Sequence, residues 1–70
     1  MNLSDRQSDA LHFIARFVKT KGYSPTVREV QEGIGHRSVS STHAVLCSLR
    51  DLEAIEWNRE LPRTLRVKRD

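Results

Sequence analysis

The sequence predicts one small domain, mainly α with a small β-hairpin at its C-terminal end. Two stretches open with the S/T-x-x-E/Q spacing of a helix capping box, beginning at Ser4 and at Thr26. A third stretch, which starts after Ser38, carries apolar residues at helical spacing. From residue 55 the apolar period changes to two, which is typical of short strands. These observations predict three helices and then a hairpin along residues 1–70.

The first helix is predicted over about residues 5–21. Gly22 follows it as a C-cap, and the connector before Pro25 is expected to be extended, because a residue that precedes proline avoids the helical region. Phe13 and Phe17 are assigned to the core, with stacking on nucleic acid bases as the alternative. The apolar residues at i, i+3, i+4 and i+7 spacing are Leu11, Ile14, Ala15 and Val18.

The second helix is predicted over about residues 27–33. The Thr26 hydroxyl and the Glu29 carboxylate can each satisfy an unpaired amide of its first turn. Gly33 and Gly35 are expected to end the helix and to permit the sharp turn of a helix-turn-helix. The apolar stripe consists of Val27, Val30 and Ile34.

The third helix is predicted over about residues 39–53, with Ser38 as its N-cap. One face is apolar, and the opposite face carries small side chains where a solvent-facing helix usually has Lys, Glu or Arg. A helix that reads DNA needs such a face, because it must lie close to base edges in the major groove. An ordinary amphipathic surface helix is the alternative. The apolar face contains Val39, Thr42, Val45, Leu46, Leu49 and Leu52, with Glu53 at its edge, and the opposite face contains Ser40, Ala44, Cys47 and Asp51, flanked by His43.

The hairpin is predicted over about residues 55–68, which we call the wing. Two strands do not hold themselves together, so Trp57, Leu65 and Val67 are expected to pack on the helices. Three helices followed by a hairpin make a three-helix winged helix-turn-helix, in which the wing lies over the sugar-phosphate backbone of DNA.

The net charge of +3 is unevenly placed along the chain. Residues 1–58 contain seven basic and seven acidic side chains, so the whole excess lies in the last twelve residues. A basic tail beside a reading helix is the electrostatic pattern expected for phosphate contact. The basic residues of this tail are Arg59, Arg63, Arg66, Lys68 and Arg69, against Glu60 and Asp70.

The residue types and spacings argue against several other classes of function. Only His43 and Cys47 share i, i+4 spacing, and zinc needs at least three protein ligands, so we expect no metal. Nucleophilic catalysis lacks a base and an orienting group, and no glycine-rich phosphate loop occurs, so we expect no enzyme, cofactor or small-molecule substrate. No apolar run reaches the length of about 18 residues that spans a bilayer, so no membrane partner is expected. A single cysteine fits a reducing compartment and a cytoplasmic location.

Four segments together resemble the N-terminal DNA-binding domain of the LexA repressor family, over nearly the full length of the chain. The similarity is greatest to versions from Gram-positive bacteria. The segments are L-S-D-R-Q at Leu3–Gln7, G-Y-S-P-T-V-R-E-V at Gly22–Val30, G-H-R-S-V-S-S at Gly35–Ser41 and L-P-R-T-L-R-V at Leu61–Val67.

The resemblance implies repression of DNA-damage (SOS) genes through a palindromic double-stranded DNA operator. The third helix would lie in the major groove and the wing on the backbone, with a homodimer or a cooperative pair occupying the two half-sites. By position, the residues expected to read bases are Ser38, Ser40, Ser41, His43, Ala44 and Cys47. Those expected to contact the DNA backbone are Thr26, Arg28, Arg37, Arg59 and Arg63.

The chain departs from the family pattern in three ways. Glu53-Ala54 stands where the family usually has Lys-Gly before the first wing strand, and Glu60 would repel a phosphate if it pointed inward. Family members also carry a C-terminal domain that dimerises and cleaves an Ala-Gly bond with Ser and Lys, whereas none of the four alanines here precedes a glycine. We expect either an excised reader domain of a self-cleaving repressor or a small phage or plasmid regulator of this kind.

A winged-helix module that binds protein is the remaining alternative, and it predicts no salt-dependent DNA binding. A sharper hypothesis concerns His43. If its imidazole donates to a guanine edge, affinity for the operator is expected to rise as the pH falls from about 7.5 to about 6.

Overall fold

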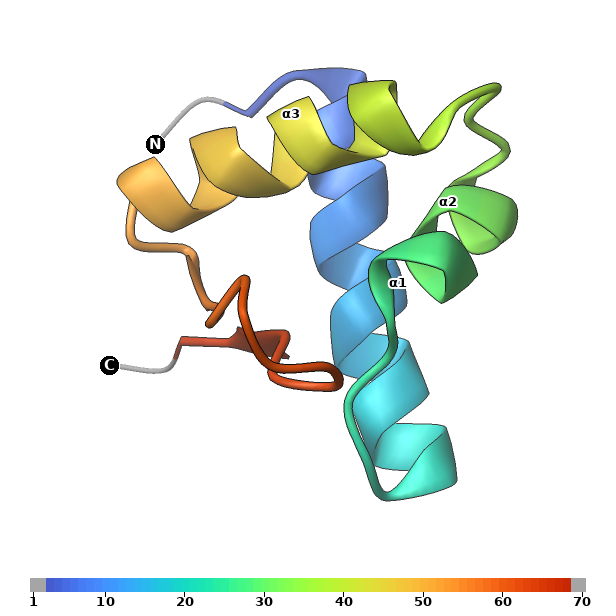
Figure 1. Cartoon of the computed structure of the whole chain (residues 1–70), viewed down its shortest axis with the longest axis vertical. Coiled ribbons are helices and arrows are strands. Elements are labelled where there is room, and N and C mark those ends of the chain that lie inside the picture. Colours follow the sequence, from blue (N-terminus) through green and yellow to red (C-terminus); the bar gives the residue numbers. More distant parts are fainter. Residues whose placement is uncertain (1–2, 69–70) are drawn as a thin grey trace.

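The computed structural model describes residues 3–68 (Figure 1). Its elements are α1 (Asp5–Lys21), α2 (Val27–Ile34), α3 (Val39–Asp51), β1 (Ile55–Glu56) and β2 (Arg66–Val67). The predicted mainly α winged helix-turn-helix, with three helices before a two-stranded hairpin, is therefore confirmed. Arg69 and Asp70, which were counted in the basic tail, lie outside the described residues.

Both predicted capping boxes form. At the start of α1, the Ser4 hydroxyl accepts from the Gln7 amide at 3.2 Å, and the Gln7 side chain accepts from the Ser4 amide at 2.8 Å. At the start of α2, Thr26 and Glu29 exchange the same two bonds at 3.1 and 2.8 Å. These bonds satisfy amides that have no partner inside a helix, so each helix begins at a position that its own sequence defines.

The core lies where α1 meets α2, α3 and the wing. α1 packs against both other helices and against β2. Thr42 of α3 is fully buried in this core, as its place on the predicted apolar face requires. Val39, the first residue of α3, and Leu52, which follows its last residue, are exposed instead, because both lie beyond the core. The buried apolar side chains are Ala10, Ile14, Val30, Leu46, Leu49, Ile55 and Leu65.

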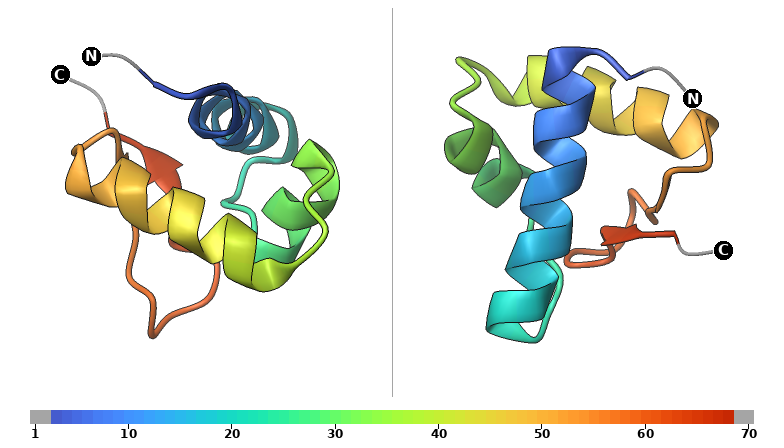
Figure 2. Two further views of the ribbon diagram at one scale, coloured as in Figure 1. Left: turned by 90° about the horizontal axis from the view of Figure 1, so that it is seen from above. Right: turned by 180° about the vertical axis from the view of Figure 1, so that it is seen from behind.

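The wing is an antiparallel pair in which Ile55 faces Val67 and Glu56 faces Arg66. Leu65 is buried, and Trp57 and Val67 pack against the core, as the sequence predicts for a hairpin that cannot stand alone. In the left view of Figure 2, the loop between the strands extends past α3 on the side away from α1. The wing loop and the outer face of α3 therefore border the same side of the molecule.

The end of α2 differs from the sequence expectation. The helix continues to Ile34, and Gly33 lies inside it instead of in the turn. Gly35 alone supplies the left-handed C-cap, with φ of 74°. Gly33 serves packing instead, since a Cβ atom built on it would lie 2.1 Å from Cε2 of Phe13.

The end of α3 also differs, since the helix stops at Asp51, two residues before the expected end. The Glu53 amide donates to the Arg50 carbonyl and the Ala54 amide to the Leu49 carbonyl, both at 2.9 Å. This pair of bonds is a Schellman motif, whose residue after the cap adopts the left-handed conformation. That residue is Glu53, with φ of 61°, so a glycine in this turn would be favourable at Glu53 and not at Ala54.

Candidate nucleic-acid interface

The outer face of α3 is open at its N-terminal end. Ser40, Ser41 and Ala44 are exposed, and so is Ser38 immediately before the helix. All four side chains are small, so a flat or convex partner can approach the helix backbone closely along this face. Cys47, one turn further along, is only half-exposed.

Hydrogen bonds fix the start of α3. The Ser38 hydroxyl accepts from the Ser41 amide at 3.2 Å and lies 3.1 Å from the Ser41 hydroxyl. Nδ1 of His36 lies 2.9 Å from Oγ1 of the buried Thr42. No role for His36 was predicted from the sequence. Its position in the turn, just before a helix with a Thr on its buried face, is the only local signal for this bond.

The side chain of His43, on α3, faces the base of the wing. Its ring meets the Trp57 ring edge to face, with 4.9 Å between centroids and 69° between planes. Its Nδ1 lies 3.9 Å from Sγ of Cys47. Because these neighbours cover one side of the imidazole, Nε2 is the nitrogen left to meet a group outside the protein.

The wing loop is closed by polar contacts that the sequence did not predict. The Asn58 amide donates to the Thr64 hydroxyl at 3.0 Å, and that hydroxyl lies 2.9 Å from the Asn58 carbonyl oxygen. At the base of the loop, the guanidinium groups of Arg50 and Arg59 lie 5.8 and 5.9 Å from the centre of the Trp57 ring. Trp57 thus joins the wing to α3 through its ring contact with His43 and through the cation of Arg50, while Arg59 covers the same ring from within the wing.

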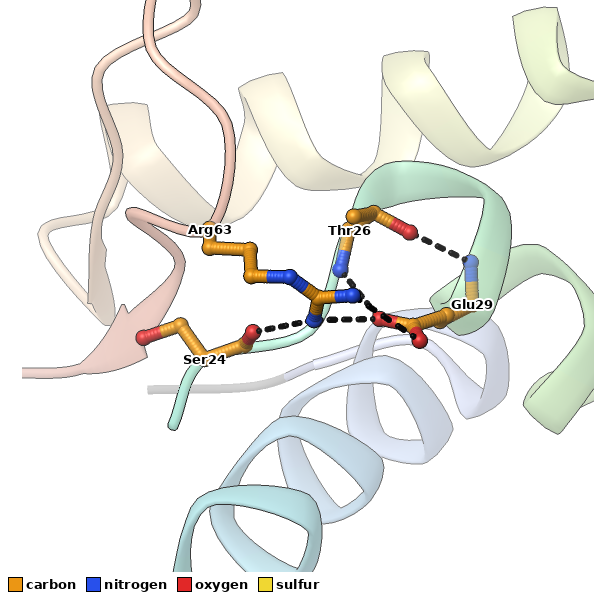
Figure 3. Close-up of polar contacts among 4 residues, drawn as sticks. All are labelled: Ser24, Thr26, Glu29 and Arg63. Carbon is orange, nitrogen blue, oxygen red and sulfur yellow. Dashed lines mark hydrogen bonds and ion pairs between the residues drawn. The ribbon is translucent and has the colours of Figure 1, made fainter. Parts of the chain in front are cut away.

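Arg63 is held against the start of α2 (Figure 3). Nη1 donates to the Ser24 carbonyl at 3.0 Å and to Oε1 of Glu29 at 2.9 Å, and Nη2 lies 3.4 Å from Oε2 of the same carboxylate. The guanidinium carbon also lies 4.8 Å from the centre of the Tyr23 ring. The sequence predicts Arg63 as a phosphate contact, and no local pattern indicates these partners.

Glu29 therefore serves two neighbours at once. Its carboxylate accepts from the Thr26 amide within the capping box and from the Arg63 guanidinium. The amide of Thr26 lowers the pKa of Glu29 most, and the hydrogen bond and charge of Arg63 lower it further. The ionised carboxylate is thus the form that this site favours.

Five of the expected site residues border one cleft of about 430 Å³. It lies between the start of α2, the middle of α3 and the wing loop. The residues are Thr26, Arg28, His43, Arg59 and Arg63. The other six expected site residues do not line it, and four of them form the exposed small face of α3 and its cap.

The basic charge of the wing is largely paired. Arg63, Arg66 and Lys68 form ion pairs with Glu29, Glu56 and Glu53, in that order. The net charge of the last twelve residues therefore overestimates how many of their cations are available for phosphate contact. Over residues 3–68, the arginines among the expected phosphate contacts that form no ion pair are Arg28, Arg37 and Arg59.

Within residues 3–68, no three His, Cys, Asp or Glu side chains are grouped to hold a metal ion. No helix within the same residues is long and apolar enough to cross a bilayer.

Comparison with known proteins gives the family. The model of the LexA DNA binding domain matches residues 1–64. The LexA repressor of Bacillus velezensis is 45% identical over 65 residues, which are 93% of this chain and 32% of the relative. The LexA repressor of Geobacillus thermodenitrificans is 42% identical, over 93% of this chain and 31% of the relative. The LexA repressor of Desulfitobacterium hafniense is 35% identical over 66 residues, which are 94% of this chain and 32% of the relative. The chain spans about a third of the length of these relatives, and it belongs to the LexA DNA-binding domain family.

Proposed function

We propose that this chain binds double-stranded DNA in a sequence-specific manner, as the reader domain of a transcriptional repressor. The observation that carries the proposal is the bare outer face of α3, beside a wing loop that borders the same side (Figure 2). Membership of a DNA-binding family supports it. In the proposed complex α3 lies in the major groove and the wing lies over the backbone.

The proposed contacts fall into two groups. Bases would be read by the small face of α3 and by Nε2 of the adjoining imidazole, where small side chains permit close approach and hydroxyls can donate or accept. Phosphates would be bound mainly by the basic side chains that form no ion pair. The proposed base-reading residues are Ser38, Ser40, Ser41, His43, Ala44 and Cys47. The proposed backbone contacts are Thr26, Arg28, Arg37, Arg59 and Arg63.

The backbone contacts would work in different ways. Thr26 is a helix cap, so it would act at the N-terminal end of α2, where the helix dipole favours a phosphate. Arg59 lies on the wing and Arg28 on α2, on two sides of the same cleft. Arg63 keeps Nε–H and one Nη2–H for a phosphate after its contacts with Ser24 and Glu29.

One such domain covers a single half-site. Function therefore requires a homodimer or a cooperative pair on a palindromic operator, since the second contact then forms at a high effective concentration. We further propose that the regulated genes belong to an SOS-type DNA-damage response, or to a small phage or plasmid circuit of that kind, in the cytoplasm.

Selection of bound duplexes from a random DNA pool tests the proposal. We expect a recurring half-site, and binding to it that weakens with salt along a straight line in a double logarithmic plot. A duplex with a changed half-site base is expected to bind more weakly by about 1–3 kcal/mol. If no duplex is enriched and binding shows no salt dependence, the proposal is wrong and a protein-binding module becomes the better interpretation.

A further inference from the structure

Arg63 forms more contacts within the chain than a phosphate-binding side chain needs. It reaches from the wing to the Ser24 carbonyl and the Glu29 carboxylate (Figure 3). It also lies over the Tyr23 ring. The three partners belong to the first turn of α2 and to the segment that leads into it. These side-chain hydrogen bonds are long-range, since they join positions 39 and 34 apart in sequence. We call the set formed by Arg63, Ser24, Tyr23 and Glu29 the wing latch.

The wing has few other means of fixing its angle. Its paired strands are two residues each, and its loop side chains Leu61 and Arg63 are exposed. The base of the hairpin is held by Trp57 on α3 and by the packing of β2 on α1. The latch adds an attachment beyond the base, at the start of α2. It therefore fixes the position of the wing loop, which the attachments at the base alone define less well.

The shape of guanidinium suits this purpose. Its planar fork donates to the carbonyl and to the carboxylate at the same time while its face lies over Tyr23. Lysine would keep the charge but not the fork. Arg63 itself adopts a left-handed backbone conformation, with φ of 57°, a geometry that L residues rarely take without compensating contacts.

We propose that Arg63 is a positioning residue, which orients the wing over the DNA backbone by latching it to Glu29 at the start of α2. This inference rests on the proposed DNA binding. It assigns Glu29 a part in binding even though a carboxylate repels phosphates. Arg63 therefore contributes through Glu29 more than through direct contact with DNA.

Replacing Glu29 distinguishes the latch from simple electrostatics, because the two predict opposite changes in the affinity for DNA. Glu29→Gln removes a negative charge near the cleft, so electrostatics alone predicts tighter DNA binding. The latch predicts weaker binding by about three- to tenfold, because the wing must be ordered when DNA binds. Glutamine keeps the capping box, since its side-chain oxygen accepts the same amide bond. The ionic contact to Arg63 is then the main loss.

Glu60→Gln is the matched control. Glu60 lies on the wing at the same cleft, is exposed and forms no ion pair within residues 3–68. The same change of charge there is expected to tighten DNA binding. Arg63→Lys completes the set. It is expected to weaken binding about as much as Glu29→Gln, whereas a plain phosphate contact would largely survive the exchange.

The experiment measures the affinity of the 70-residue chain and of these three variants for a duplex selected by the wild-type protein. Hydroxyl-radical footprints are taken at matched occupancy, and thermal unfolding verifies the fold. Loss of protection on the backbone under the wing, with protection by α3 unchanged, supports the latch. If Glu29→Gln or Arg63→Lys binds as tightly as the wild type or more tightly, the latch is rejected. If the wild type itself binds no duplex, the proposed function fails instead.

Discussion

The ring of Phe13 occupies the space that a Cβ atom on Gly33 would need. A Cβ atom built there lies 2.1 Å from Cε2 of the ring, far inside van der Waals contact. This close approach joins α1 to α2 immediately before the turn that leads to α3. A glycine within a helix usually weakens the helix. At Gly33 the absence of a side chain permits the packing of Phe13, and it does not serve a turn.

Gly33→Ala is therefore expected to destabilise the domain, although alanine is the better helix former. Helix propensity favours alanine by about 1 kcal/mol, whereas overpacking costs about 1–3 kcal/mol, so the net effect is a loss. Urea unfolding measures it. In a Phe13→Leu background the same substitution is expected to be neutral or stabilising. A rise in stability with Phe13 intact would contradict the packing argument.

Glu53→Gly is expected to stabilise the domain. The left-handed conformation costs a non-glycine residue about 1–2 kcal/mol, and the exposed ion pair with Lys68 that would be lost contributes about 0.2–1 kcal/mol. Glu53→Ala is the control, because it removes the ion pair and keeps the strain. Thermal unfolding is expected to rank Gly above wild type and wild type above Ala. An Ala variant as stable as the Gly variant would show that the turn carries no strain.

The fold is largely predictable from the sequence because its signals are local. The capping boxes at Ser4 and Thr26 and the apolar stripes lie within a few residues of the bonds and faces that they define. The sequence predicts Gly33 in the turn, because glycine commonly ends helices. Its actual use depends on Phe13, on another helix, which no local pattern reveals.

The site is less predictable, because its geometry depends on pairs that are distant in sequence. The exposed small face of α3 follows from helical periodicity alone. The bond from Arg63 to Glu29 joins residues 34 apart in sequence. A count of basic residues does not reveal such a pair, so it predicts Arg63 as an unpaired cation. The ring of Trp57 meets His43 only after the wing folds back on α3. Charge and spacing therefore predict which side chains are exposed more reliably than which partners those side chains have within the fold.

Stability is expected to depend on pH through Glu29. Its pKa is lowered in the folded state, first by the Thr26 amide and then by Arg63, so folding favours the ionised form. The resulting stabilisation is complete above the usual pKa of a glutamate. It is lost as the pH falls through the lowered pKa, which lies below the usual pKa of a glutamate. Urea unfolding between about pH 6 and about pH 3 is expected to show a steeper loss for the wild type than for Glu29→Gln. Parallel curves would exclude this linkage.

A larger side chain on the outer face of α3 is expected to weaken DNA binding without unfolding the domain. Ala44 is exposed, so Ala44→Leu leaves the core unchanged but holds the helix away from base edges. We expect affinity for the selected duplex to fall at least about tenfold, or 1.4 kcal/mol. Ala15→Leu makes the same change at an exposed position of α1 and is expected to bind normally. Equal affinity for both variants would show that DNA lies on another surface.

His43 is expected to make DNA binding depend on pH. Because Nδ1 faces Cys47 and the ring rests on Trp57, Nε2 is the atom available to a base edge. Protonation makes both ring nitrogens donors and adds a charge that phosphates attract, so affinity is expected to rise as the pH falls from about 7.5 to about 6. His43→Ala is expected to flatten this slope and to cost about 1–3 kcal/mol at one base position. His12→Ala, on the exposed side of α1, is the control. Fluorescence anisotropy at fixed salt gives the slopes, and identical slopes for wild type and His43→Ala would rule out a base contact by this imidazole.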